Sequence, residues 1–185
     1  MYNLFQGYEN IVFDFDKTIA SLPIDWATER ENFKKFSKEN FGYIFDENFR
    51  VDEMEYVLFR NFPEKKKTIL EFRKQLESSC MTNVFPNDEI IEIISVKKHK
   101  YFIISNNLYS TIIYYLNLYN ISKKFIDIVG VDTYFSPKPC INSWVNLKSK
   151  FNLTESHTLF VGDSPDTDAK FAKSCGLSYF QLPSF

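Results

Sequence analysis

The chain has 185 residues, of which 44% are hydrophobic and 25% are charged, and its formal net charge is −2. This length and composition fit one globular domain, or one core with an insertion, and they exclude a disordered chain. Because no basic stripe accompanies the small net charge, they also argue against a dedicated nucleic-acid binder.

Hydrophobic patterning predicts a chain in which strands and helices alternate. Residues 11–15 form a continuous apolar run up to their aspartates, which is typical of a strand buried on both faces of a sheet. The later elements that we expect are helix 87–96, strand 101–105, helix 109–118, strand 126–131, helix 142–151, strand 158–162, helix 166–175 and strand 179–182. This alternation predicts an α/β fold: a Rossmann-like, doubly wound parallel sheet with helices on both faces.

The stretch between the first strand and the helix at residue 87 has a different character. It contains three helical patterns, at residues 25–40, 52–61 and 63–79, and no convincing strand. A helical block of this size is too long for a simple crossover between strands. We therefore predict an inserted helical cap over residues 21–84 and a core made of residues 1–20 and 85–185.

Polar motifs follow the predicted strands, at the edge where doubly wound sheets bind ligands. The first motif is Asp14 and Asp16, separated by one residue, with Asp14 at the end of the first strand and Asp16 on the turn that leaves it. Two carboxylates in this position suit an aspartyl nucleophile with a neighbouring acid/base, or a pair of ligands for Mg²⁺. Aspartates are also common at turns for purely structural reasons.

The second motif is Ser105-Asn106-Asn107, which offers a hydroxyl, amides and backbone N–H groups near a helix start. It could cradle an oxyanion or simply cap the following helix. The third is Lys138, held between two prolines. It could present a fixed positive charge to a phosphate, or it could be an exposed loop lysine.

The fourth motif runs from Gly162 to Asp168 and contains Asp163, Asp166 and Asp168. Carboxylates gathered beside the first aspartate pair repel one another unless a cation holds them. A capping role is plausible for Asp166 alone, but it does not explain Asp163.

Taken in order, these four motifs resemble those of the haloacid dehalogenase superfamily of phosphohydrolases, over nearly the whole chain. The helical block looks like the cap of its phosphoglycolate-phosphatase-like branch. The resemblance implies that Asp14 is a nucleophile that forms an aspartyl-phosphate. It implies that Asp16 first protonates the leaving group and then activates water.

The resemblance also implies which residues bind the phosphoryl group and the metal. The phosphate-binding residues would be Thr18, which would also help to fix Asp16, together with Ser105, Asn106 and Lys138. Mg²⁺ would be held by Asp14, Asp16 (through its backbone carbonyl), Asp163 and Asp168. Asp168 fits the helix phase better than Asp166, but Asp166 remains an alternative.

Asp16 favours phosphoryl chemistry over dehalogenation, because dehalogenase members of the superfamily lack an acid/base carboxylate at that place. We expect a small phosphorylated metabolite as substrate and a monomer or homodimer. A phosphosugar mutase of the same fold stays open as an alternative, as does a non-catalytic or receiver-like phospho-binding regulatory domain. Lys17 departs from the family pattern, since many members have glycine there.

Several residues outside the motifs carry weaker expectations. Cys80, Cys140 and Cys175 are widely spaced and odd in number, so we expect small buried thiols in a reducing compartment. The chain shows no membrane span and no signal peptide, which predicts a cytoplasmic protein without membrane contact. All four arginines fall in the predicted cap, where one could grip an anionic substrate or all could be solvated: Arg30, Arg50, Arg60 and Arg73.

Overall fold

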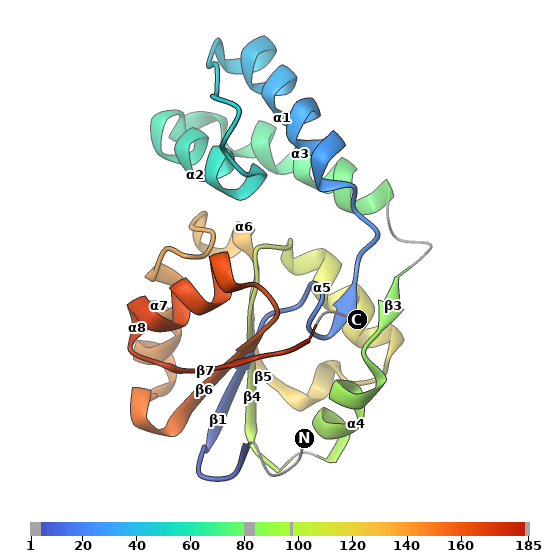
Figure 1. Ribbon diagram of the computed structural model, residues 1–185, viewed down its shortest axis with the longest axis vertical. Coiled ribbons are helices and arrows are strands. Elements are labelled where there is room, and N and C mark those ends of the chain that lie inside the picture. Colours follow the sequence, from blue (N-terminus) through green and yellow to red (C-terminus); the bar gives the residue numbers. More distant parts are fainter. Residues whose placement is uncertain (1–4, 80–83, 97, 184–185) are drawn as a thin grey trace. The chain divides into compact units, whose positions relative to one another are not determined.

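The computed structural model describes residues 5–79, 84–96 and 98–183. The chain forms two units, one made of residues 1–22 with residues 84–185, and the other of residues 23–83 (Figure 1). The first unit carries the sheet, and the second is helical.

A five-stranded parallel sheet lies at the centre of the first unit, in the order β5-β4-β1-β6-β7. The strands are β1 (Asn10–Phe13), β4 (Lys100–Ile104), β5 (Phe125–Val129), β6 (Thr158–Gly162) and β7 (Ser178–Gln181). From β1 the chain builds outward to β4 and β5, and then returns to the other side of β1 for β6 and β7. The order therefore reverses between β1 and β6, which is the place where doubly wound sheets bind ligands. The predicted α/β fold is confirmed.

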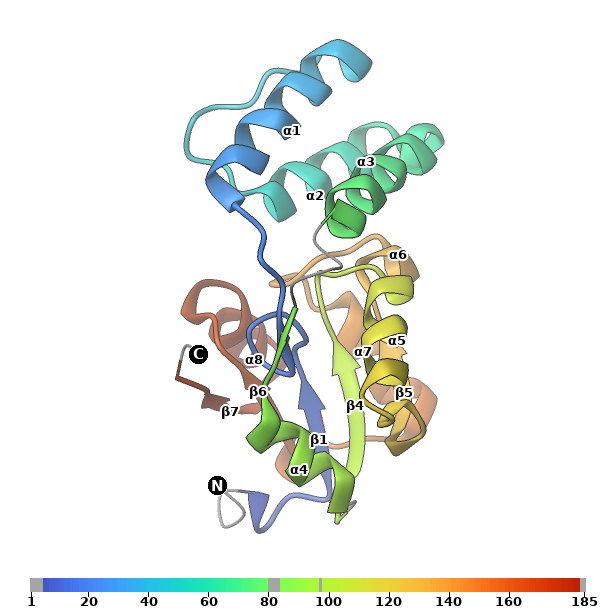
Figure 2. The same cartoon turned by 90° about the vertical axis from the view of Figure 1, so that its right-hand side faces the viewer.

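Helices cover both faces of this sheet (Figures 1 and 2). One face carries α4 (Asp88–Val96) and α5 (Tyr109–Leu118), and the other carries α7 (Asn142–Phe151) and α8 (Lys170–Cys175). Shorter pieces are α6 (Val131–Tyr134) and the 3₁₀ turns η3 (Ser122–Lys124) and η4 (Glu155–His157).

The helix predicted at residues 166–175 begins as a π-helix, η5 (Pro165–Ala169), and only then continues as α8. The reason is that the carbonyl oxygen of Ser164 accepts two backbone hydrogen bonds. They come from Asp168 at 3.0 Å and from Ala169 at 3.1 Å, so the first turn is wider than an α-helical turn.

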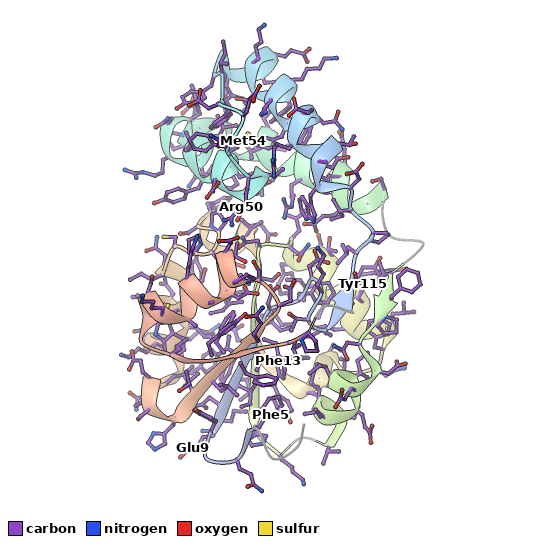
Figure 3. The ribbon with its side chains drawn as sticks, viewed as in Figure 1. Phe5, Glu9, Phe13, Arg50, Met54 and Tyr115 are labelled. Carbon is purple, nitrogen blue, oxygen red and sulfur yellow. The ribbon has the colours of Figure 1, made fainter. Side chains whose placement is uncertain are left out.

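Strand β1 buries side chains on both faces of the sheet, as its continuous apolar run predicts. Val12 belongs to a core cluster with Phe102 and Phe160. Phe13 points the other way and packs against Phe5 and Tyr101, with ring centroids 6.1 Å and 5.8 Å apart (Figure 3). Burial on both sides fixes β1 and therefore the residues that follow it.

A two-stranded antiparallel ribbon holds together the two ends of the segment that leaves the core. It pairs β2 (Ala20–Ser21) with β3 (Phe85–Pro86), with Ala20 opposite Pro86 and Ser21 opposite Phe85. No strand was predicted from Ser21 up to the helix at residue 87. Strands of two residues carry no periodic pattern, which is why both were missed.

The second unit consists of α1 (Trp26–Phe41), α2 (Val51–Asn61) and α3 (Lys66–Ser79), with the 3₁₀ turn η2 (Pro63–Lys65) before α3. The Asp25 carboxylate caps α1 by accepting hydrogen bonds from the backbone N–H groups of Ala27 and Thr28. The helices bury an apolar core of their own that includes Phe33, Leu58 and Met54 (Figure 3).

None of the helices in the described ranges is long and apolar enough to cross a lipid bilayer. Cys140 is a half-buried free thiol and Cys175 a buried one, while Cys80 lies outside the described residues.

Candidate active site

Asp14 stands at the carboxyl edge of the sheet, where the strand order reverses. The last residue of β1, Phe13, pairs with Ile103 of β4 and with Val161 of β6. The backbone N–H of Asp14 donates to the carbonyl of Val161 at 2.9 Å, so its main chain is tied to β6 one residue beyond the strand. The side chain is buried, with 7% of the residue exposed.

The turn that follows Asp14 is held by its own backbone. Lys17 adopts a left-handed conformation, with φ at 55°, and its N–H donates to the carbonyl of Ala20 at 2.7 Å. This conformation explains why glycine suits the position, and it shows that lysine preserves the turn. The carboxylate of Asp16 accepts a hydrogen bond from the backbone N–H of Leu22 at 2.9 Å.

Thr18 is fully buried in the same turn. Its carbonyl accepts a hydrogen bond from the side-chain amide of Asn87 at 3.1 Å. Its hydroxyl oxygen has no hydrogen-bond partner among the described residues. The main chain of Leu22 therefore holds the Asp16 carboxylate, and no hydrogen bond from Thr18 supports the expectation that Thr18 fixes it.

Lys138 reaches the end of β1 from the loop after α6. Its ammonium lies 2.7 Å from a carboxylate oxygen of Asp14 and 2.5 Å from one of Asp168. Only 3% of the residue is exposed, so the alternative of an exposed loop lysine is wrong. Lys138 is a fixed cation between two carboxylates.

The side chain of Asn106 holds the main chain of Lys138. The N–H of Lys138 donates to Oδ1 of Asn106 at 2.7 Å, and Nδ2 of Asn106 donates to the carbonyl of Lys138 at 3.2 Å. Asn106 was predicted to be one of the phosphate-binding residues. In the structure its amide spans both backbone groups of Lys138, which places Lys138 relative to β4.

Ser105 directly follows β4 and is buried. Its hydroxyl donates to Oδ1 of Asn107 at 3.0 Å and accepts from the N–H of Asn107 at 3.2 Å. Helix α5 begins at Tyr109, and its N-cap residue is Leu108. Ser105 is therefore not the N-cap of this helix, and the capping alternative is wrong.

Three carboxylates gather around Lys138 at the ends of β1 and β6. Asp14, Asp163 and Asp168 each offer an oxygen, and these oxygens all lie within 4.8 Å of one another. Asp168 is fully buried, whereas Asp166 is exposed and pairs with Lys170 at 2.9 Å. Of the two alternatives for the fourth motif, Asp168 reaches the group. The carboxylate of Asp16 is not among the three.

Asp168 is locked beneath Gly162 and Ser164. The backbone N–H of Ser164 donates to its Oδ2 at 3.1 Å. A Cβ atom on Gly162 would lie 2.6 Å from Cγ of Asp168 and closer still to Oδ2, which is nearer than real Cβ contacts come. Only glycine lets the carboxylate approach the end of β6 so closely.

Burial and mutual repulsion govern the charges of this group. Burial raises the pKa of Asp14; the Lys138 charge opposes that effect, and Asp168 adds to it. Burial and Asp168 also raise the pKa of Asp163. Burial alone would lower the pKa of Lys138, but Asp14 and Asp168 outweigh it and raise this pKa, so the side chain stays protonated.

The donor set fits a hard divalent cation. All three side chains offer carboxylate oxygens, the ligand type that Mg²⁺ prefers, and the group contains none of the His or Cys donors typical of zinc sites. Three carboxylates against one ammonium leave an excess of negative charge, which a cation would balance.

The arginines of the helical unit are mostly engaged within it. Arg73 is buried, and its guanidinium lies 2.8 Å from Glu77, 3.4 Å from Glu55 and 5.3 Å above the ring of Trp26. For this residue the interpretation as a solvated helix arginine is wrong. The others are half-buried or exposed: Arg30, Arg50 and Arg60.

Two residues of β7 reach the fourth motif and were not predicted. The Tyr179 hydroxyl donates to the backbone carbonyls on either side of Asp163. The Gln181 side chain donates to the carbonyl of Asp163 itself. In the sequence, these two residues are marked only by lying in the last predicted strand. The strand that pairs with it cannot be identified before the fold is known.

The family model described as haloacid dehalogenase-like hydrolase matches residues 11–181. No curated protein matches the chain.

Solved structures of similar fold come from several bacteria. A predicted phosphoglycolate phosphatase from Haemophilus somnus is 18% identical with a TM-score of 0.61, over 97% of this chain and 87% of its own. A HAD-superfamily hydrolase of subfamily IA from Geobacter sulfurreducens is 17% identical with a TM-score of 0.58, over 96% and 90%. The protein YfnB of Bacillus subtilis, solved bound to magnesium, is 18% identical with a TM-score of 0.59, over 96% and 87%.

Proposed function

Because the chain belongs to the haloacid dehalogenase-like hydrolase family, we propose that it is a phosphatase for a small phosphorylated metabolite and uses Mg²⁺. The observation that carries the proposal is the buried Lys138 ammonium between Asp14 and Asp168, beside Asp163. A phosphoryl group bound there would meet a carboxylate, a fixed cation and a metal-ligand set at once. The similar fold of a predicted phosphoglycolate phosphatase and of a magnesium-bound protein also supports it.

In the first half of the proposed reaction, a carboxylate oxygen of Asp14 attacks the phosphorus atom. The bond from phosphorus to the ester oxygen breaks, and Asp16 gives the leaving oxygen a proton. The ammonium of Lys138 offsets negative charge on the phosphoryl oxygens as the group is transferred. Bound Mg²⁺ would supply further positive charge to the same oxygens.

In the second half, water attacks the phosphorus of the aspartyl-phosphate while Asp16 accepts its proton. The bond between Asp14 and phosphorus breaks, which releases inorganic phosphate and restores the Asp14 carboxylate. Asp16 thus acts first as an acid and then as a base. The backbone N–H of Leu22 orients it for both steps.

The remaining residues hold the phosphoryl group and the metal. We assign phosphate binding to Ser105 and Lys138, with Asn106 acting through Lys138, and we keep Thr18 in this group as a buried hydroxyl of the same turn. The metal ligands that we propose are the carboxylates of Asp14, Asp163 and Asp168 and the backbone carbonyl of Asp16.

The helical unit is proposed as the cap that selects a small substrate. A cytoplasmic location and a monomer or homodimer remain part of this proposal.

The test is release of inorganic phosphate from a panel of esters, with Mg²⁺ and with EDTA. The panel contains phosphoglycolate, sugar phosphates, nucleoside monophosphates and an aryl phosphate. We expect hydrolysis that depends on Mg²⁺ and that Asp14→Asn abolishes in a folded protein. Asp166→Asn is the matched control, because this exposed carboxylate of the fourth motif pairs with Lys170 and should be dispensable.

Two results would contradict the proposal. One is the absence of phosphate release from every ester by folded protein with Mg²⁺ present. The other is retained turnover in Asp14→Asn, which would remove Asp14 as the nucleophile.

A further inference from the structure

The segment that carries Asp163 is irregular backbone between β6 and η5, so its position needs an explanation. Strand β7 runs beside β6, with Phe160 paired to Tyr179 and Gly162 paired to Gln181. The end of β7 therefore lies next to the segment from Gly162 to Ser164.

Donors from β7 and the residue after it reach three successive carbonyl oxygens of this segment. The carbonyl of Gly162 accepts from the backbone N–H of Leu182 at 2.8 Å and from the hydroxyl of Tyr179 at 3.1 Å. The same hydroxyl lies 3.5 Å from the carbonyl of Ser164. Nε2 of Gln181 donates to the carbonyl of Asp163 at 3.3 Å.

The Tyr179 hydroxyl is itself held in place by packing. Its ring is stacked on Phe160 with an interplanar angle of 28°, and Phe160 is fully buried against Phe171. Packing that fixes the rotamer of a supporting residue keeps the geometry of the site that it supports. The Tyr179 hydroxyl is therefore held beside the segment from Gly162 to Ser164.

The segment needs such support because its carboxylates repel one another. The charge of Asp168 acts on Asp163, and both lie within 4.8 Å of Asp14 through their oxygens. Repulsion among these groups disfavours the position of Asp163 beside Asp14 and Asp168, although the charges of Lys17 and Lys138 partly oppose it. On the Asp168 side the N–H of Ser164 provides one contact that retains the segment, at 3.1 Å.

We infer that Tyr179 and Gln181 are positioning residues that hold the Gly162–Asp163–Ser164 backbone so that the Asp163 carboxylate stays beside Asp14 and Asp168. Their hydrogen bonds to this segment go to its main-chain carbonyls, so they would act on a metal through Asp163. The inference rests on the proposed function for the identity of that metal, Mg²⁺.

The experiment measures Mg²⁺ binding by titration calorimetry without substrate, together with the Mg²⁺ concentration that gives half-maximal phosphate release. Tyr179→Phe keeps the ring on Phe160 and removes only the donor. Gln181→Ala changes an exposed side chain, which guards against a variant that fails to fold. Tyr114→Phe is the matched control, because Tyr114 is an exposed tyrosine of α5.

We expect Tyr179→Phe and Gln181→Ala each to weaken Mg²⁺ binding by roughly two- to tenfold, the ratio that one neutral hydrogen bond supplies. The KM for the ester at saturating Mg²⁺ should stay unchanged. The double variant should lose less than the product of the single losses, since both residues hold one segment. Tyr114→Phe should behave as wild type.

The outcomes separate this inference from the proposed function. Unchanged Mg²⁺ affinity in both variants, with a wild type that binds Mg²⁺ and hydrolyses esters, would overturn the inference alone. A wild type that neither binds Mg²⁺ nor hydrolyses any ester would overturn both.

Discussion

Lys17 holds a backbone conformation that glycine adopts more easily than any other residue. With φ at 55°, its Cβ crowds the following carbonyl, which costs about 1 kcal/mol relative to glycine. The turn still forms because the N–H of Lys17 bonds to Ala20, and the carbonyl of Phe15 accepts from Thr18, Ile19 and Ala20. These hydrogen bonds therefore offset the energetic cost of the strained conformation of Lys17.

We predict that Lys17→Gly stabilises the protein by about 0.5 to 1 kcal/mol in urea unfolding. Relief of the left-handed strain exceeds the entropy that glycine adds to the unfolded chain. Lys17→Asn should fall between the two, since asparagine tolerates this conformation better than lysine. A less stable Lys17→Gly variant would show that the lysine side chain makes a contribution larger than the strain.

At the scale of elements, an ionic cluster joins α2 to α3. One guanidinium, that of Arg73, faces the carboxylates of Glu55 and Glu77, and all three side chains are buried. The second oxygen of Glu55, Oε2, has no hydrogen-bond partner in the described part of the chain. Burial raises the pKa of Glu55 to about 7, although Arg73 opposes it.

The stability of the protein should therefore fall as the pH rises from 4.5 to about 7. Because the pKa of Glu55 in the folded protein lies above its usual 4.5, the folded state holds the proton more tightly than the unfolded chain does. The stabilising contribution is complete below about pH 4.5 and is lost as the pH passes the folded value.

We predict that Glu55→Gln removes this loss, so that the variant gains up to about 3 kcal/mol over wild type between pH 5 and pH 8. Glu77→Gln is the control, because it breaks the 2.8 Å pair and should cost about 3 kcal/mol at pH 8. Chemical unfolding at several pH values measures both. Parallel curves for wild type and Glu55→Gln would contradict the prediction.

Most elements that have a periodic pattern were predicted to within about three residues of their bounds, whereas short elements without one were not predicted. Strand β6 and helix α5 begin and end where the sequence analysis placed them. The ribbon of β2 and β3 is too short to have a period. The contact of Asn106 with Lys138 spans 32 residues, and that of Tyr179 with Gly162 spans 17. Contacts of this kind can be predicted only once the sheet order is known.

The same reasoning applies to the site. Motif order predicted which strand ends would meet, because parallel strands bring their carboxyl ends to one edge of the sheet. It left Asp166 and Asp168 unresolved, because their difference is burial: one faces solvent and the other lies under Gly162.

For the whole molecule, the buried carboxylate group would link folding to the binding of the proposed metal. Asp14, Asp163 and Asp168 must be brought together in the folded state, while the unfolded chain keeps them apart in water. A ligand that binds only the folded state stabilises it by mass action. Mg²⁺ should therefore report on folding as well as on activity.

We predict that Mg²⁺ at about 100 times its dissociation constant stabilises the protein by about 2.7 kcal/mol. In a chain of this size that corresponds to a rise in melting temperature of about 5 to 10 °C. Asp163→Asn should lose the response, and Asp166→Asn should keep it. Scanning calorimetry with Mg²⁺ and with EDTA measures the shift, and an unresponsive wild type would count against the metal site.

The ribbon of β2 and β3 has a consequence for how such a protein can change over evolution. Because Ser21 and Phe85 are direct neighbours, the polypeptide leaves and re-enters the core at adjacent points. A segment with adjoining ends can be lengthened, trimmed or exchanged without moving β1 or the turn that holds Asp16. The ribbon would therefore let the helical unit, which we propose selects the substrate, diverge while the residues that we propose for the chemistry keep their places.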